Sequence, residues 1–253
     1  MDNSTICGGL GTLKTVKQPE PRKTSKPADL IIYLIIGILF LWLLFTLKPD
    51  LLRTLTGQNQ LADIPASTAK TALQQLEIRP RTERAPEYQR NEFGESWADV
   101  DGNGCDTRND ILGRDLIEKQ YRRGSNCVVK QGLLEDPYTG EKVAFIRGPQ
   151  TSEIVQIDHV VALGDAWRSG AYKWDLAKRE AFANDPENLL AVVGYVNEDK
   201  GRSRADQWLP PQEEYHCAYV ARQIKVKAKW QLSIISSEKE TFVNVLANCP
   251  ATG

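Results

Sequence analysis

The sequence predicts an α+β domain preceded by one transmembrane helix. Three patterns support this prediction: an unbroken apolar run at residues 30–47, a β-branched stretch with alternating polar residues at 154–161, and an amphipathic stretch with helical spacing at 212–230. The chain has 253 residues, of which 41% are hydrophobic, so it can form one globular domain of ordinary size besides the apolar run. Its formal net charge is −1, and any nucleic-acid contact must therefore come from a local basic patch.

The N-terminal part of the chain is expected to anchor the domain in the cell membrane. Residues 1–29 are polar and show no periodicity, as in a disordered tail. The run at 30–47 is long enough to span a bilayer, and it is longer and starts later than the apolar core of a signal peptide. Five basic residues precede it and two follow it closely, which places the N-terminus in the cytoplasm and the domain outside. Residues 48–90 are predicted to be a linker or stalk with a short helix at 67–76.

Cysteine usage agrees with this topology. Cys7 lies on the predicted cytoplasmic side, and four cysteines lie outside, an even number that suits a disulfide-forming compartment. Of the three pairings that four cysteines allow, Cys105–Cys127 and Cys217–Cys249 are favoured because each closes a local loop. A four-cysteine zinc site is disfavoured because no two of them have Cys-x-x-Cys spacing.

Residues 91–253 are expected to form the folded domain, whose first half contains turns, a helix and strands. Turn-forming residues fill 97–110; their acidic spacing suggests a calcium-binding loop, but the glutamate expected at the twelfth position is missing, so we interpret them as turns. Asn109 or Asp110 can cap a helix that runs to about Arg123. Strands are predicted at 126–134 and 142–146, joined by a turn at 136–140, and at 154–161.

The second half is predicted to be mainly helical. Asp175 can cap a helix in which Leu176, Phe182 and Ala183 point inward. Helices are predicted at 164–169, 176–184, 212–230 and 236–247.

Polar residues lie near the end of the strand at 154–161 and at the start of the next apolar run. Asp158 and His159 lie side by side near the end of that strand, and the chain has only two histidines. Asn188 leads the second apolar run, and Asn197 and Lys200 are three residues apart, on one face of a helix. Strand, strand and helix in this order can build a small site for one metal ion and one phosphodiester. His159 is the candidate base, since a neutral imidazole can take a proton near neutral pH.

This ordered set resembles the His-Asn-His (HNH) nuclease motif, whose fold is a metal finger of two strands and a helix. The surrounding sequence resembles the secreted HNH family, which is related to the C-terminal nuclease domain of modification-dependent (GmrSD-type) restriction enzymes. The resemblance implies a ββα-metal finger embedded in a helical domain. In one respect the sequence departs from the plain motif, since Asn197 stands at the third, histidine-like position. The resemblance covers about residues 92–249, and the segments that carry it are 104–110, 166–171, 177–185 and 208–211.

The resemblance, together with the chemistry and spacing of the side chains, suggests a role for each site residue. His159 would activate water, Asp158 and Asn197 would hold a divalent ion, and Asn188 would orient the loop between the strands. Alternation along the strand directs Asp158 away from the His159 face, whereas the resemblance implies that the chain turns there and the carboxylate reaches the metal. The ion is expected to be Mg²⁺, with Mn²⁺ and Zn²⁺ as alternatives. Lys200 would approach a phosphate oxygen as a point charge. The candidates for further phosphate contacts are Arg108, Arg202 and Arg204.

The same residues have simpler structural interpretations. Asp158 and His159 can be a polar strand end, and Asn188 a turn amide. Asn197 can be a helix N-cap, and the basic residues that follow it can be a solvated face.

The sequence thus predicts a membrane-anchored, outward-facing, metal-dependent HNH endonuclease that hydrolyses nucleic acid, with DNA favoured over RNA and no protein partner inferred. The alternative is a surface-displayed module that binds nucleic acid or a protein through an inactive HNH scaffold. A modification-dependent restriction enzyme is disfavoured, because the sequence has no Gly-x-x-x-x-Gly-Lys-Ser/Thr phosphate loop and the domain is expected on the outer side of the membrane.

Overall fold

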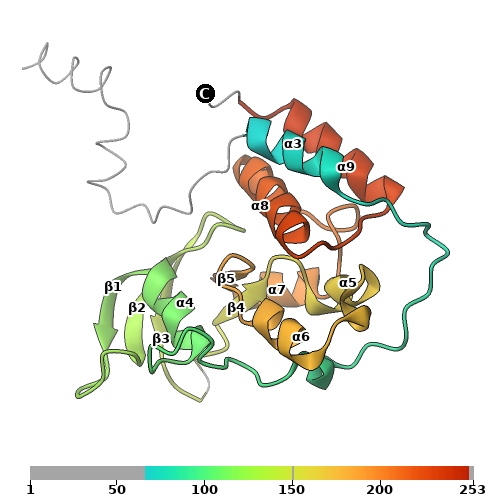
Figure 1. Cartoon of the computed structure of the whole chain (residues 1–253). Helices are drawn as coiled ribbons and strands as arrows, with labels where there is room; N and C mark the ends of the chain where they lie inside the picture. Colours follow the sequence, from blue (N-terminus) through green and yellow to red (C-terminus); the bar gives the residue numbers. More distant parts are fainter. Residues whose placement is uncertain (1–65, 150, 251–253) are drawn as a thin grey trace, which may run out of the picture. The chain divides into compact units, whose positions relative to one another are not determined.

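The structure is a computed structural model, and it describes residues 66–149 and 151–250 (Figure 1). The chain divides into two compact units, Met1–Gln58 and Asn59–Gly253, and the described residues belong to the second. The expected tail, the apolar run at 30–47 and the first part of the expected linker lie outside the described residues. Within residues 66–149 and 151–250, no helix is long and apolar enough to cross a membrane.

Two small antiparallel sheets organise the described part of the chain. Strands β1 (Leu116–Tyr121), β2 (Val129–Glu135) and β3 (Lys142–Ile146) form a meander in the order β1-β2-β3. Strands β4 (Val155–His159) and β5 (Leu189–Val193) form a second sheet of two strands. The strands predicted at 126–134, 142–146 and 154–161 are β2, β3 and β4, and the second apolar run, after Asn188, is β5, so the existence of all four is confirmed.

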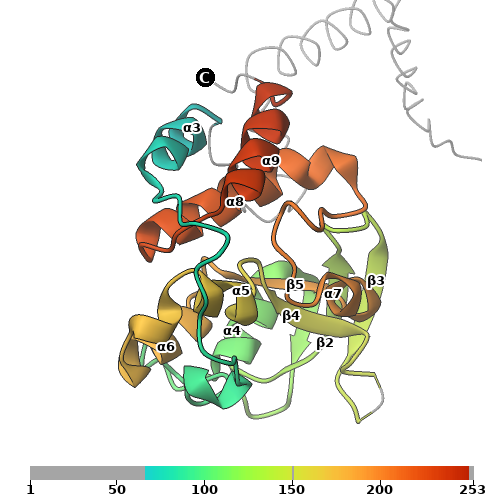
Figure 2. The ribbon, with the colours of Figure 1, turned by 90° about the vertical axis from the view of Figure 1, so that its right-hand side faces the viewer.

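Helices accompany these sheets, so the predicted α+β class is confirmed. Figures 1 and 2 show α3, α8 and α9 gathered at one end, while α5, α6 and α7 lie around β4 and β5. The four helices predicted in the second half of the domain are present as α5, α6, α8 and α9. The helices are α3 (Ala66–Gln75), α4 (Thr107–Asp115), α5 (Leu163–Arg168), α6 (Leu176–Ala183), α7 (Gly194–Lys200), α8 (His216–Lys229) and α9 (Ser236–Ala247), with short 3-10 turns η1 (Arg90–Phe93), η2 (Ala171–Lys173) and η3 (Glu213–Tyr215).

The β4–β5 sheet lies between two apolar clusters. On one face, Leu190 and Val192 join the cluster formed by α3, α8 and α9. On the other face, Leu189 and Ala191 join Leu112 and its neighbours from α4 and the meander. Strand β5 is therefore buried along its whole length, which explains why it is apolar at every position rather than at alternate ones.

Two local predictions are wrong. The helix expected to run to about Arg123 is capped instead by Asp106, whose side chain accepts a hydrogen bond from the backbone of Asn109, and it ends at Asp115. The next residues form β1, because Leu116 pairs with Leu134 of β2 and both are buried; this tertiary pairing overrides local helix propensity. Leu176 was expected to point inward, but 53% of its surface is exposed.

The described part of the segment expected to be a linker packs into the domain. Leu73 and Leu76 of the α3 region are buried in the same cluster as α8 and α9. After α3, Ile78 forms a parallel bridge with Ile234, and the backbone amide of Arg79 donates to the Ile234 carbonyl at 2.9 Å. Residues 66–79 are thus an integral part of the domain and not a separate stalk.

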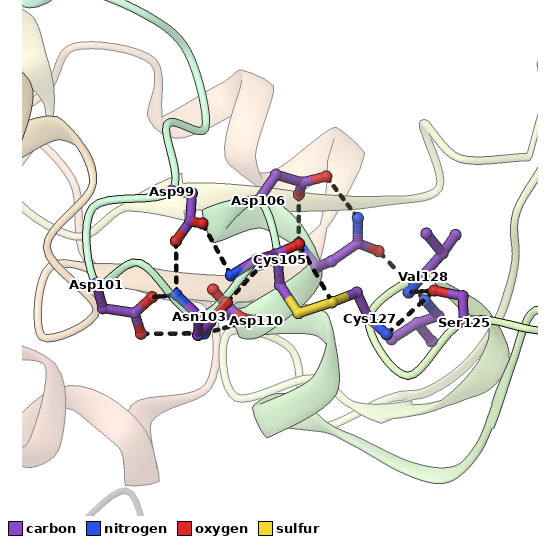
Figure 3. Close-up of a disulfide and its surroundings, with 12 residues drawn as sticks. Asp99, Asp101, Asn103, Cys105, Asp106, Asp110, Ser125, Cys127 and Val128 are labelled. Carbon is purple, nitrogen blue, oxygen red and sulfur yellow. Dashed lines mark hydrogen bonds between the residues drawn. A yellow bond between two sulfur atoms is a disulfide. The ribbon is translucent and has the colours of Figure 1, made fainter.

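Both favoured disulfides are confirmed. Cys217–Cys249 joins the start of α8 to the residues after α9. Cys105–Cys127 joins the acidic loop before α4 to the turn between β1 and β2 (Figure 3). In that loop, the backbone and side-chain amides of Asn103 donate to nearby aspartates, as expected for turn chemistry.

Candidate active site

The predicted order of strand, strand and helix is present as β4, β5 and α7. Helix α7 begins directly after β5, at Gly194, where a Cβ atom would lie 2.2 Å from the carbonyl oxygen of Glu153. Only glycine permits this close approach. Gln156 of β4 then holds the helix, because its side chain bonds Asn197 at 2.8 Å and Glu198 at 3.0 Å.

Asp158 is the centre of a buried polar network. Its Oδ1 accepts a hydrogen bond from Lys200 Nζ at 2.9 Å, and its Oδ2 accepts one from the Tyr138 hydroxyl at 2.6 Å. Lys200 also donates to the carbonyl oxygen of His159 at 2.8 Å. Burial, and then the charge of Asp158, raises the pKa of Tyr138 well above its ordinary value, so the phenol remains the donor.

This network changes the expected role of Lys200. The lysine has no exposed surface. It lies inside the domain, where its ammonium group forms an ion pair with Asp158. A phosphate contact therefore does not fit its position. The solvated face that was the simpler alternative for Lys200 does not fit either.

His159 is held as a neutral base. Its Nε2 lies 2.8 Å from the carbonyl oxygen of Ala183, which can only accept, so Nε2 carries the proton and Nδ1 keeps its lone pair. Its ring stacks on Trp97, with centroids 6.1 Å apart. Burial lowers the pKa of His159 to about 4, although the Ala183 carbonyl and Asp158 oppose the shift. The imidazole is consequently unprotonated at neutral pH.

Asn188 fixes the chain just after the histidine. Its Oδ1 accepts from the backbone amide of Val161 at 2.8 Å, and its Nδ2 donates to the Val161 carbonyl at 3.2 Å. The Asn188 carbonyl accepts a further bond from the amide of Val160 at 2.8 Å. The asparagine is fully buried, and these three bonds connect the loop after β4 to the start of β5.

Asp158, His159 and Asn197 border one cavity of about 230 Å³. Strand β4 continues through Asp158 and His159, which pair with Leu190 and Leu189 and therefore point to opposite faces of the sheet; the expected turn between them is absent. Both nevertheless reach the cavity because it lies at the end of the strand.

The oxygens at this cavity fit a hard, largely hydrated cation. The Nδ2 of Asn197 is used by Gln156, which leaves its Oδ1 for a ligand, and Asp158 lines the same cavity, with its two carboxylate oxygens also accepting from Lys200 and Tyr138. Residues 66–149 and 151–250 contain no cluster of three or more histidine, cysteine or acidic side chains placed so that it could hold a metal ion. A cation bound here would thus have few protein ligands and would keep most of its waters, as Mg²⁺ does.

The three arginines expected to contact phosphate lie in different places. Arg202 is exposed and lines the cavity, with its guanidinium 5.9 Å from the centre of the Tyr88 ring. Arg204 pairs with Asp206 at 3.0 Å. Arg108 is half-buried and donates to backbone carbonyls beside the start of β4, so it supports the strand and does not reach the cavity.

The sequence-family model described as the C-terminal domain of GmrSD restriction endonucleases matches residues 106–245. The chain belongs to this family. It is also 37% identical, over 186 residues, to an uncharacterized secreted protein of Arthroderma benhamiae, an alignment that covers 73% of this chain and 86% of that protein. No solved structure matches the chain. The resemblance inferred from the site residues and their context is therefore confirmed at the level of the family.

Three residues at the candidate site of this GmrSD-family chain were missed by sequence reasoning. Tyr138 belongs to a turn between β2 and β3, and nothing in that turn indicates that its phenol reaches Asp158. Arg90 lines the cavity from a segment before the family match, and Trp97 stacks on the histidine from a loop. Only the tertiary fold brings these segments to β4.

Proposed function

We propose that the chain is a metal-dependent HNH endonuclease that hydrolyses phosphodiester bonds of nucleic acid, with DNA favoured over RNA. The observation that carries the proposal is the state of His159: a neutral imidazole with its Nε2 proton bound to a carbonyl and its Nδ1 lone pair left for a water. His159 borders the same cavity as Asp158 and Asn197. Membership of a restriction-endonuclease domain family supports the reaction class.

In this proposal His159 accepts a proton from the attacking water at Nδ1. The bond from Nε2 to Ala183 fixes the tautomer, and Asn188 fixes the loop that follows the histidine. Asp158 and Asn197 would hold the divalent ion, which supplies charge compensation at the phosphate and the leaving oxygen. Lys200 keeps the Asp158 carboxylate in place and does not itself touch substrate.

The proposed location is the outer face of the cell membrane, with the run at 30–47 as the anchor. Two disulfides in the domain are expected in an oxidising compartment. The similar protein of A. benhamiae is described as secreted, which agrees with an extracytoplasmic domain.

The test compares the two histidines of the chain. The full-length protein in mild detergent is incubated with supercoiled plasmid and with RNA, in Mg²⁺, in Mn²⁺ and in EDTA. His159→Ala should lower the rate of cleavage by about 10²- to 10⁴-fold, the usual contribution of a general base. His216→Ala is the matched control, because His216 also bonds a carbonyl, that of Pro210 at 2.7 Å, but does not line the cavity.

Cleavage lost in EDTA and in His159→Ala, but retained in His216→Ala, supports the proposal. Folded wild-type protein that cuts neither DNA nor RNA in any divalent metal would refute it. Binding of nucleic acid or a protein without turnover would then favour the binding module on an inactive scaffold.

A further inference from the structure

We propose that an arginine-lined cleft beside the active-site cavity binds the sugar–phosphate backbone of the substrate strand next to the bond that is cut. The identity of the substrate rests on the proposed function. The arginine cleft has a volume of about 470 Å³ and shares Tyr88 and Arg202 with the cavity that holds His159. A strand with its scissile phosphate at His159 can thus continue directly into it. The cleft is lined by one acidic residue, Glu83, and by six arginines: Arg79, Arg81, Arg84, Arg168, Arg202 and Arg204.

Arg79 provides the strongest indication that the cleft takes an anion. Only 7% of its surface is exposed, yet its Nε has no hydrogen-bond partner and no carboxylate of the described residues pairs with it. The backbone bond to Ile234 holds it in this position. A buried N–H without an acceptor is costly, and a phosphate oxygen would supply both the acceptor that Nε lacks and the opposite charge.

The other arginines increase the positive potential of the cleft. Arg81 and Arg84 are exposed and carry their charge at its edge. Burial lowers the pKa of Arg168, and the nearby charges of Arg204, Arg202 and Arg79 lower it further, although Asp165 opposes them. Such mutual repulsion is relieved when an anion binds.

The acidic residues near the cleft only partly balance this charge. Glu83 lies 3.5 Å from Lys173. Asp206 pairs with Arg204, and Asp165 forms its closest ion pair with the buried Lys227 at 2.8 Å. Guanidinium groups that remain unpaired bind phosphate through parallel hydrogen bonds, independently of base sequence.

The cleft fits a strand better than a single phosphate. Six arginines and a volume about twice that of the active-site cavity exceed what one phosphate group needs. Arg79, Arg81 and Arg84 precede the family match at residues 106–245. This N-terminal segment therefore adds a substrate-binding wall to the catalytic unit.

The experiment measures binding separately from cleavage. Full-length His159→Ala protein in mild detergent is titrated against a fluorescent oligonucleotide, single- or double-stranded, at several salt concentrations. In the same background, Arg81→Ala/Arg84→Ala removes two charges from the cleft. The control, Arg122→Ala/Arg123→Ala, removes two exposed arginines that do not line it.

The cleft variant should bind about tenfold more weakly than the parent, while the control should stay within about twofold of it. The slope of log affinity against log salt concentration should become shallower in the cleft variant, by about 1.8 for duplex or about 1.4 for single strands. Equal losses in the cleft and control variants would overturn the inference. Binding of inorganic phosphate as tight as that of the oligonucleotide would also overturn it, in favour of a one-phosphate site.

Cleavage of a small diester, bis-p-nitrophenyl phosphate, by protein with His159 intact separates this inference from the proposed function. If the cleft variant cuts the small diester normally but cuts plasmid slowly, both are supported. If it cuts both at the wild-type rate, the inference fails and the nuclease remains. If the wild type cuts nothing but binds strands through the cleft, the nuclease proposal fails and the inference remains.

Discussion

Replacing Lys200 by methionine tests the buried network beside the candidate active site. Methionine keeps an unbranched side chain one atom shorter, and it removes the charge and both hydrogen bonds, to Asp158 at 2.9 Å and to the His159 carbonyl at 2.8 Å. Lys200 is fully buried and Asp158 is 4% exposed, so the variant leaves the Asp158 carboxylate without its counter-charge in a largely buried position. Removing one member of such a buried ion pair costs about 3–5 kcal/mol of unfolding free energy. For a domain of this size, that corresponds to a fall in melting temperature on the order of 10 °C.

The assay is denaturant unfolding of the full-length protein at pH 7 in EDTA, followed by tryptophan fluorescence. Lys200→Met, Asp158→Asn and the double variant form a thermodynamic cycle, which should show a coupling energy above about 1 kcal/mol. Tyr138→Phe is the milder comparison, because it removes one hydrogen bond from Asp158 and leaves the charge pair; it should cost about 1–3 kcal/mol.

Added Mg²⁺ extends the test to the proposed metal site. Without Lys200, the Asp158 carboxylate lacks its buried counter-charge, so Mg²⁺ should stabilise Lys200→Met more than the wild type. A loss of less than about 1 kcal/mol in Lys200→Met, or simple additivity in the cycle, would refute the buried pair.

Three further predictions concern the frame of the domain. Gly194→Ala should lower the unfolding free energy by about 1–3 kcal/mol, because its Cβ would lie 2.2 Å from a backbone carbonyl oxygen. Gly113→Ala, inside α4 with its nearest atom 3.4 Å away, should be neutral or stabilising; equal losses at both positions would contradict the argument. Replacing Cys217 and Cys249 by serine opens a loop with a sequence separation of 32 and should cost about 4 kcal/mol, measured by denaturant unfolding without reductant. Burial raises the pKa of Glu238 from 4.5 to about 7, so the native state binds this proton more tightly than the unfolded state. The unfolding free energy should therefore fall as the pH rises from 4.5 to about 7, and then level off. Glu238→Gln should flatten that slope in unfolding curves collected across this range, and an unchanged slope would show that other groups cause it.

The sequence by itself determined the elements whose signals are local. Period-two alternation identified β4, and Asp175 identified the start of α6, where its side chain accepts from the Lys178 amide as a cap should. Short separations also sufficed for the two disulfides, because each closes a loop between segments that are close in the chain. The order of Asp158-His159, Asn188 and Asn197, together with the surrounding segments, identified the family, since such a pattern can be recognised along the chain without knowledge of the fold.

Only the tertiary structure decided what the site residues contact. The end of α4 was decided by pairing between β1 and β2, which no local propensity contains. Lys200 was expected at a phosphate, yet it is buried against Asp158 because α7 packs on the Asp158 face of β4. Arg79 belongs to a segment whose composition suggests a linker, and its position depends on backbone bonds to Ile234, 155 residues later in the chain. Such contacts depend on packing between segments that are distant in the chain. The sequence shows the same polar or charged residue whether that packing exposes it, buries it or places it beside a partner, so local patterns do not distinguish these outcomes.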